Sequence, residues 1–259
     1  MPVIPAWCFD SIVTLGQPRQ HGAQPLWFGT GAVVRRVTAG DVGEVTRYFL
    51  VTARHVATHA LAVAPTFYAA FPDNHAIAVP SAPGAVSRWR YPGNAEVDIA
   101  VLELPANTHA NIGASFDLSA NTARVAWLAA NDVREGIECF VITGLTGSHD
   151  TEIATIYGNE RIARRATIAH NRETLLDIHR PMRLDGFVWN GSSGAPLVFV
   201  NIDNQNEPQA RLIGIVANYV PYPDLATALN DDAKVKVVFN SGIFTAYAID
   251  SSLDIIEAW

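Results

Sequence analysis

The 259-residue sequence is poor in lysine, in cysteine and in long apolar runs. Lys234 and Lys236 are its only lysines, and 18 basic residues stand against 25 acidic ones, for a formal net charge of −7. Nucleic-acid-binding surfaces normally carry a positively charged stripe, so we expect no nucleic-acid partner. Nor does any stretch approach the roughly 18 apolar residues of a spanning helix, so we expect no membrane partner.

Cysteine is too rare for a metal cluster or a disulfide framework, because only Cys8 and Cys139 occur. A single bridge between them is one alternative, and buried free thiols are the simpler prediction. The N-terminal residues also lack the basic segment and apolar run of a secretory signal. These absences favour a reducing, cytoplasmic location.

Hydrophobic residues make up 49% of the chain and charged residues 17%, which is enough for one packed core. Most apolar segments are short, rich in β-branched and aromatic residues, and bounded by Gly, Pro, Asn or Asp, as strands of barrels and sandwiches are. We expect strands at 11–15, 31–34, 47–52, 98–104, 137–142, 165–168, 195–200 and 211–216. Helical periodicity is convincing at 250–259, a single helical turn fits 55–61, and 17–28, 65–95, 105–124 and 201–210 read as surface loops. The fold class is all-β.

The most informative segment is 190–198 (NGSSGAPLV), where small residues crowd around Ser193 ahead of an apolar strand. Glycines allow the backbone of such a turn to expose a hydroxyl and to aim N–H groups at a developing oxyanion. An ordinary Ser/Gly turn between strands explains this segment alone equally well.

Two further segments supply candidate partners for this serine. His55 follows an apolar strand, where an imidazole can be held as a general base, and Asp98 immediately precedes another, where a carboxylate can orient that imidazole. A half-buried histidine and a turn aspartate are the bland interpretations, and each is favoured when its segment is considered alone.

The order His55, Asp98, Ser193 separates the known serine-triad folds. The α/β-hydrolase order needs a histidine after the serine, yet no histidine follows His179, and Ala195 replaces the last glycine of the G-x-S-x-G elbow. The subtilisin order needs an α/β chain with the aspartate ahead of the histidine. Only the chymotrypsin order fits.

With these residues in place, the chain resembles the chymotrypsin/trypsin-like serine proteases, closest to bacterial intracellular and HtrA-type protease domains. The matching segments are 29–33 (GTGAV), 50–55 (LVTARH), 98–102 (DIAVL), 191–197 (GSSGAPL), 212–216 (LIGIV) and 241–247 (SGIFTAY). The resemblance implies one peptidase domain over 1–259, built of two six-stranded Greek-key β-barrels of the chymotrypsin type, about 1–115 and 116–259, and a C-terminal helix. No room remains for a C-terminal PDZ module.

The same resemblance implies a serine endopeptidase that cleaves protein or peptide substrates through a His55-Asp98-Ser193 triad and an acyl-enzyme. It places the oxyanion hole at the N–H groups of Gly191 and Ser193. It assigns the primary specificity pocket to Phe187 at the floor, to Ala217, Asn218 and Tyr219 along the wall, and to Gly242. No carboxylate stands at the floor, so we expect a small or medium apolar residue before the cut, with Tyr219 narrowing the entrance.

Some family features are missing. Ser192 stands where secreted trypsins carry the aspartate that binds a new N-terminal amine, and Val56 replaces the cysteine next to the catalytic histidine. Activation by that ion pair is therefore not expected.

Two alternatives remain open. His55 and His59 lie one helical turn apart, but the H-E-x-x-H glutamate and a third ligand are absent, so we expect no metal, and we expect no cofactor. The more serious alternative is a catalytically silent or partner-gated two-barrel module that acts in protein binding, for which an activating protein partner is left open.

Overall fold

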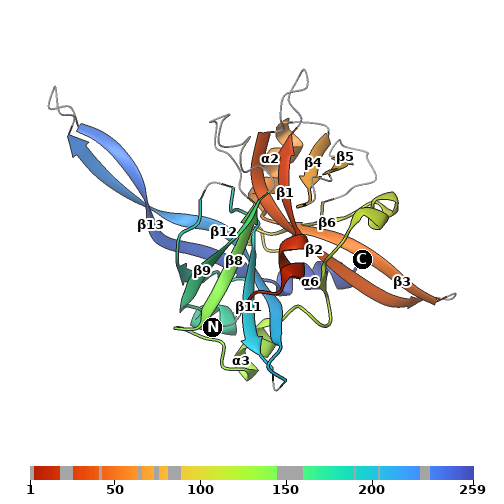
Figure 1. The fold of residues 1–259 in the computed structure, drawn as a ribbon. Coiled ribbons are helices and arrows are strands. Elements are labelled where there is room, and N and C mark those ends of the chain that lie inside the picture. Colours follow the sequence, from red (N-terminus) through yellow and green to blue (C-terminus); the bar gives the residue numbers. More distant parts are fainter. Residues whose placement is uncertain are drawn as a thin grey trace.

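The computed structural model describes residues 3–17, 26–40, 43–63, 66–72, 76–80, 89–144, 160–189, 191–203, 205–227 and 234–259. Its strands form two units that pack side by side, with the C-terminal helix behind them (Figure 1). We call these the N-terminal sheet and the C-terminal barrel.

The N-terminal sheet has the strand order β5-β4-β1-β2-β3-β6, with β7 parallel to β2. Its neighbours along that path are antiparallel. The strands are β1 (Ile12–Gln17), β2 (Leu26–Gly40), β3 (Gly43–Thr52), β4 (Thr66–Ala70), β5 (Ala76–Pro80), β6 (Ala100–Glu103) and β7 (Phe116–Asp117).

The C-terminal barrel is closed, in the order β10-β13-β12-β11-β8-β9 with β9 pairing back to β10. Its strands are β8 (Glu138–Gly144), β9 (Arg161–His170), β10 (Met182–Asp185), β11 (Pro196–Ile202), β12 (Pro208–Thr227) and β13 (Lys234–Ala248). The far halves of β12 and β13 leave the barrel as a two-stranded arm (Figure 1).

Both units follow one strand order, because three consecutive strands pair in sequence and the fourth returns beside the first. This is the Greek-key arrangement, with order 4-1-2-3. The fold class expected from the sequence, an all-β chymotrypsin-like two-barrel fold with a C-terminal helix, is confirmed. One detail is wrong: among the described residues the N-terminal sheet is a curled half-barrel, because β5 and β6 do not pair, and only the second unit closes.

Side-chain alternation divides the buried residues among three clusters, since successive residues of a strand point to opposite faces. Val33 and Leu50 face the inside of the N-terminal sheet, whereas their chain neighbours Val34 and Phe49 face the seam between the units. In the same way Val141 faces the barrel interior and its neighbours face the seam.

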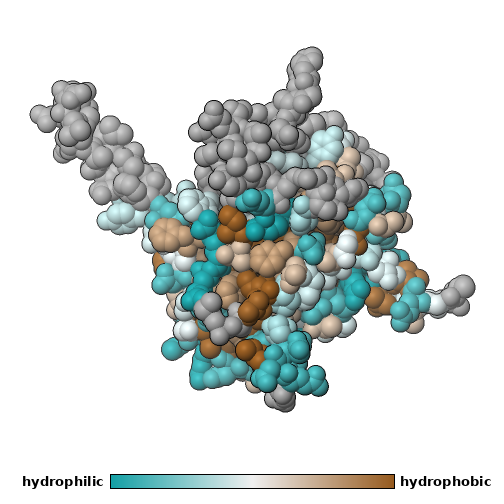
Figure 2. All heavy atoms as spheres, viewed as in Figure 1, coloured by the Kyte–Doolittle hydropathy of each residue, from teal (hydrophilic) through white to brown (hydrophobic). Residues whose placement is uncertain are grey.

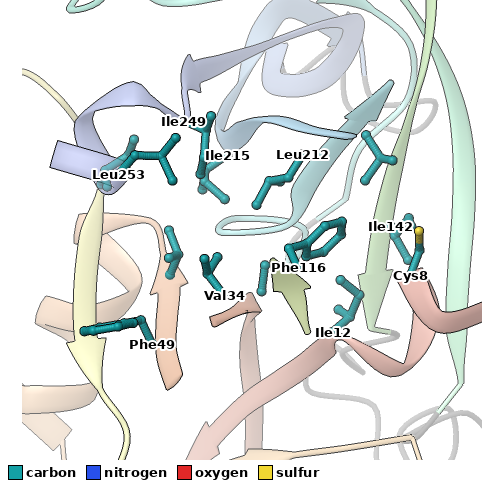
Figure 3. Packing of buried hydrophobic residues seen from close by; sticks show 14 of the residues in the cluster. Cys8, Ile12, Val34, Phe49, Phe116, Ile142, Leu212, Ile215, Ile249 and Leu253 are labelled. Carbon is teal, nitrogen blue, oxygen red and sulfur yellow. The ribbon is translucent and has the colours of Figure 1, made fainter. Parts of the chain in front are cut away.

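The seam cluster is drawn in Figure 3, where side chains from both units and from the C-terminal segment point toward one another. Figure 2 shows hydrophobic residues reaching the surface in the middle of the face that carries α1 (Ala6–Asp10) and β8. Partly buried residues of the α1 segment pack on the cluster there, namely Ile4, Trp7 and Phe9.

The helices are short. Besides α1 they are α2 (Arg54–Val63), η2 (Ala106–Asn111), α3 (Val125–Ala130), α5 (Arg172–Leu176) and α6 (Asp250–Glu257). Helices α2 and α6 lie where the sequence predicts them, and no helix among the described residues is long and apolar enough to span a membrane. The prediction of loops at 65–95 is wrong in part, because β4 and β5 form there from a segment whose loop-like Pro and Asn mask its short apolar alternation.

Cys8 and Cys139 are both buried and free, as expected. They belong to different clusters, the seam and the barrel interior. Burial raises the pKa of each thiol to about 12.

Candidate active site

His55 lies in the first turn of α2, immediately after β3 ends at Thr52. Its Nδ1 lies 2.7 Å from Asp98 Oδ2, and its backbone N–H donates to Asp98 Oδ1 over 2.9 Å. The carboxylate therefore hydrogen-bonds to both the ring and the main chain of His55. With Nδ1 turned to Asp98, the other ring nitrogen is free to face a reacting group.

Asp98 sits just ahead of β6, in a segment held from two sides. The Arg54 Nη1 donates to the Ala95 carbonyl over 2.9 Å, and the Tyr247 hydroxyl from the C-terminal barrel donates to the Glu96 carbonyl over 2.7 Å. Burial acts to raise the pKa of the Asp98 carboxyl, but hydrogen bonds and attraction from His55, with the Arg54 N–H, hold that pKa below its ordinary value. Asp98 is thus an anion at neutral pH.

Ser193 lies in the turn that joins β10 to β11, docked against the N-terminal sheet. Its carbonyl accepts the Thr30 N–H over 2.9 Å. The next residue, Gly194, has φ +83°, and a Cβ there would lie 2.1 Å from both the Thr30 carbonyl oxygen and Thr52 Oγ1. Only glycine permits this approach. The Ser193 hydroxyl donates to the Ala217 carbonyl over 3.1 Å.

The side chains of His55 and Ser193 line one cavity of about 330 Å³ at the junction of the two units. No hydrogen bond joins these two side chains in the described structure. Three of the residues expected in the specificity pocket line the cavity too, Ala217, Asn218 and Tyr219. Further lining residues, which were not among the candidate site residues, are Phe28, Val188, Trp189 and Val216.

Phe187 and Gly242 lie elsewhere than expected. Neither lines the cavity, and Phe187 is 60% exposed instead of forming a floor. Its ring lies beside Gly242, where an added Cβ would be 3.9 Å from the Phe187 Cζ. The count of six residues back from Ser193 reaches the right turn, but from this turn the buried Val188 and the 58% exposed Trp189 line the cavity and Phe187 does not.

The backbone of the Ser193 turn leaves two N–H groups free. The N–H of Ser192 donates to the Trp189 carbonyl, that of Gly194 to Val216 and that of Ala195 to Ser192. Those of Gly191 and Ser193, in contrast, donate to no group in the described part of the chain. Buried backbone N–H groups are rarely left unpaired, so this pair is suited to an anionic or carbonyl oxygen in the cavity.

Ser192 stands where secreted trypsins carry an aspartate, and here it bonds to the nearby backbone of Trp189. It is buried, and its Oγ accepts the Trp189 N–H over 3.1 Å. With the Ser192 N–H donating back to the Trp189 carbonyl over 2.9 Å, the turn closes on itself. The sequence signal was the serine itself, because a hydroxyl readily bonds nearby backbone.

His59, the second histidine of the pair considered as a metal site, makes a packing contact. The His59 ring meets Phe28 edge-on, with ring centroids 4.9 Å apart. No group of three or more potential metal ligands occurs among the described residues.

Comparison with known proteins finds likeness in structure only, since no protein-family model and no curated protein matches the chain. Solved structures that resemble it are chymotrypsin-fold serine protease domains of low identity. They include the MamO protease domain from Magnetospirillum magneticum, with a TM-score of 0.49, 12% identity and 98% of each chain covered. Another is an inactive form of a serine-to-alanine mutant of Rv3671c from M. tuberculosis, with a TM-score of 0.45, 14% identity, and 98% of this chain and 89% of that one covered. A third is the serine protease domain of the Sesbania Mosaic Virus polyprotein. It has a TM-score of 0.45 and 12% identity, and 95% of this chain and 91% of that one are covered.

Replacing Gly194 with alanine should destabilise the protein, because the new Cβ meets Thr30 and Thr52 and the backbone there is left-handed. We expect the free energy of unfolding to fall by about 2–5 kcal/mol, from about 1–2 for the left-handed residue and about 1–3 for overpacking. Urea unfolding measures this. Gly113→Ala is the matched control, since a Cβ there meets nothing within 4 Å. Equal stability of the two variants would contradict the tight docking.

Proposed function

We propose that the protein is a serine endopeptidase that hydrolyses protein or peptide substrates. One observation carries this proposal: a histidine bound to a half-buried carboxylate, a serine hydroxyl and two residues with free N–H groups line a single cavity. These are the groups that acyl transfer needs, as a base, a nucleophile and oxyanion donors.

In the proposed reaction the free ring nitrogen of His55 takes the Ser193 proton as Oγ attacks the peptide carbonyl. The oxygen of the tetrahedral intermediate is stabilised by the Gly191 and Ser193 N–H groups. When the C–N bond breaks, His55 returns the proton to the leaving amine. Water then enters, gives a proton to His55 and releases the acyl group from Ser193. Asp98 remains charged throughout and stabilises the imidazolium.

The resting direction of the Ser193 hydroxyl bears on a second candidate function. The hydroxyl donates to the Ala217 carbonyl, so its proton must leave that acceptor and turn toward His55 before His55 can take it. Catalytic hydrogen bonds are often incomplete until substrate binds, which fits a competent enzyme. The same observation favours the alternative of a silent or partner-gated module. In that module the Ser193 hydroxyl would reorient only when a protein partner binds.

The cavity supports a preference for a small or medium apolar residue before the cut. Its lining is apolar or uncharged apart from His55, and no described lining residue carries a carboxylate that would pair with arginine or lysine. Because Tyr219 lines it, we propose that this side chain limits the size of the residue accepted.

A fluorophosphonate probe, which reacts with activated serines, should label the protein at Ser193. We expect stoichiometric labelling of the natural sequence and none of Ser193→Ala. Ser119→Ala is the matched control, because Ser119 bonds only to its neighbour Asp117 outside the cavity, and it should label fully. A folded protein that stays unlabelled would refute the enzyme, and labelling restored only by an added protein would establish the gated module.

Replacing Asp98 with asparagine should lower kcat by roughly 10⁴-fold, because an amide can neither fix the required imidazole tautomer nor stabilise its charged form. The rate of peptide hydrolysis measures this, with circular dichroism to confirm folding. Asp132→Asn changes an exposed aspartate paired only with Arg134 and should leave kcat intact. A loss smaller than about tenfold for Asp98→Asn would argue against its role.

A peptide library should show alanine, valine or leucine before the cleaved bond, with modest selectivity of about 1–3 kcal/mol per methylene. Tyr219→Ala should shift the preference toward phenylalanine by opening the cavity. Tyr222→Ala, on the same strand but 59% exposed and outside the cavity, should not change the profile. A library dominated by arginine or lysine would overturn this specificity.

A further inference from the structure

Thr30 occupies the point where the N-terminal sheet meets the Ser193 turn. It lies in β2 between two glycines, and its side chain is fully buried. The sequence analysis noted the GTG segment for its resemblance alone and assigned the threonine no role. The seam places it under Gly191 and Ser193, which line the cavity and whose N–H groups have no partner in the described structure.

Thr30 bonds to both of those residues. Its N–H donates to the Ser193 carbonyl over 2.9 Å, and its hydroxyl donates to the Gly191 carbonyl over 2.7 Å. Thr30 is itself fixed, because the Thr52 hydroxyl donates to its carbonyl over 2.7 Å. Each bond is shorter than 3 Å and buried, so water cannot readily replace it.

A threonine hydroxyl has one proton, and here it goes to Gly191. The other neighbour of Thr30 Oγ1 is Thr143 Oγ1 at 3.2 Å, from strand β8 of the barrel. Thr143 has its own acceptor in the Gly144 carbonyl at 2.9 Å. The Thr30 bond to Gly191 is therefore the one direct side-chain link from the N-terminal sheet to this turn in the described structure.

The bond to Gly191 matters because that residue is the loosest point of the turn. Its φ is +95°, a conformation that glycine leaves as easily as it adopts. Since peptide groups are planar, holding the Gly191 carbonyl fixes the direction of the peptide that follows it. The Thr30 N–H holds the Ser193–Gly194 peptide in the same way, so the Ser192–Ser193 peptide, which carries the free Ser193 N–H, lies between two peptides that Thr30 fixes.

We propose that Thr30 is the positioning residue of the oxyanion hole, and that its hydroxyl, by holding the Gly191–Ser192 peptide, keeps the adjoining Ser193 N–H oriented for the oxyanion. This inference rests on the proposed peptidase activity. The hydroxyl holds the turn from the neighbouring sheet, while Ser192 closes it from within. Thr30 touches no substrate and acts only through Gly191 and Ser193.

The test compares Thr30→Val, which keeps the shape and removes the hydroxyl, with Thr30→Ser, which keeps the hydroxyl. For Thr30→Val we expect kcat to fall about 10²-fold, the scale of losing one oxyanion donor, with KM changed less than about threefold. Thr30→Ser should recover kcat to within about fivefold of the natural protein. A peptide boronate, which forms a tetrahedral adduct, should lose affinity in parallel with kcat, whereas a non-cleaved peptide ligand should not.

Thr14→Val is the matched control. Thr14 pairs with Thr30 across β1 and β2 and is equally buried, but its hydroxyl has no hydrogen-bond partner in the described structure. This variant should keep kcat within about twofold of the natural protein. It separates loss of one specific bond from loss of any buried hydroxyl.

The outcomes separate the two proposals. If the natural protein neither labels nor cleaves, the proposed function fails. If it does and Thr30→Val keeps full kcat, or if Thr30→Ser is as impaired as Thr30→Val, only the role of Thr30 is refuted. Should Thr30→Val not fold, Thr30→Ala takes its place: slow labelling that Thr30→Ser restores supports the proposal, and normal labelling refutes it.

Discussion

The hydrogen bond from the Thr30 N–H to the Ser193 carbonyl joins the two halves of the molecule where the candidate catalytic residues meet. It forms only because Gly194 lets the turn lie directly on Thr30 and Thr52. Thr52 ends β3, and His55 follows within three residues on the same rigid strand-to-helix corner. Docking the turn on that corner therefore fixes Ser193 relative to His55, and the apolar seam cluster supplies the energy that keeps the units together.

Around this contact most of the described polar groups are bonded. Asp98 has its charge satisfied by His55 and by N–H groups, which is why its pKa lies below the ordinary value in spite of burial. The turn satisfies its own N–H groups except at Gly191 and Ser193. Burying an unpaired donor costs free energy, and under the proposed function two unpaired donors that line one cavity would recover that cost when an oxyanion forms.

The parts predictable from sequence were those with local signals. Strand ends and chain order point to His55, Asp98 and Ser193 as candidates, and an apolar face points to α6, whereas β4 and β5 lie in a stretch that reads as loop. Phe187 was misplaced because counting residues gives position along a turn but not the direction of a side chain. The role proposed for Thr30 has no local signal in the sequence, because its partners, Gly191 and Ser193, are distant in sequence and are met only across the seam.

The N-terminal sheet is open where the C-terminal barrel is closed, and Asp98 lies at that open edge. In the C-terminal barrel the fifth and sixth strands, β12 and β13, are joined as a hairpin and close the ring with ladder bonds. The corresponding strands of the N-terminal sheet, β5 and β6, are short, and the chain between them carries Asp98 immediately before β6. That edge of β6 is held by a single bridge, in which Arg90 and Val101 exchange backbone bonds of 2.8 and 2.9 Å. The segment ahead of it is held by side chains as well: Arg54 at the Ala95 carbonyl, Tyr247 at the Glu96 carbonyl and His55 at Asp98 itself. Two of these come from the sheet and one from the barrel, so the carboxylate, like Ser193, is aligned only when the two units are docked.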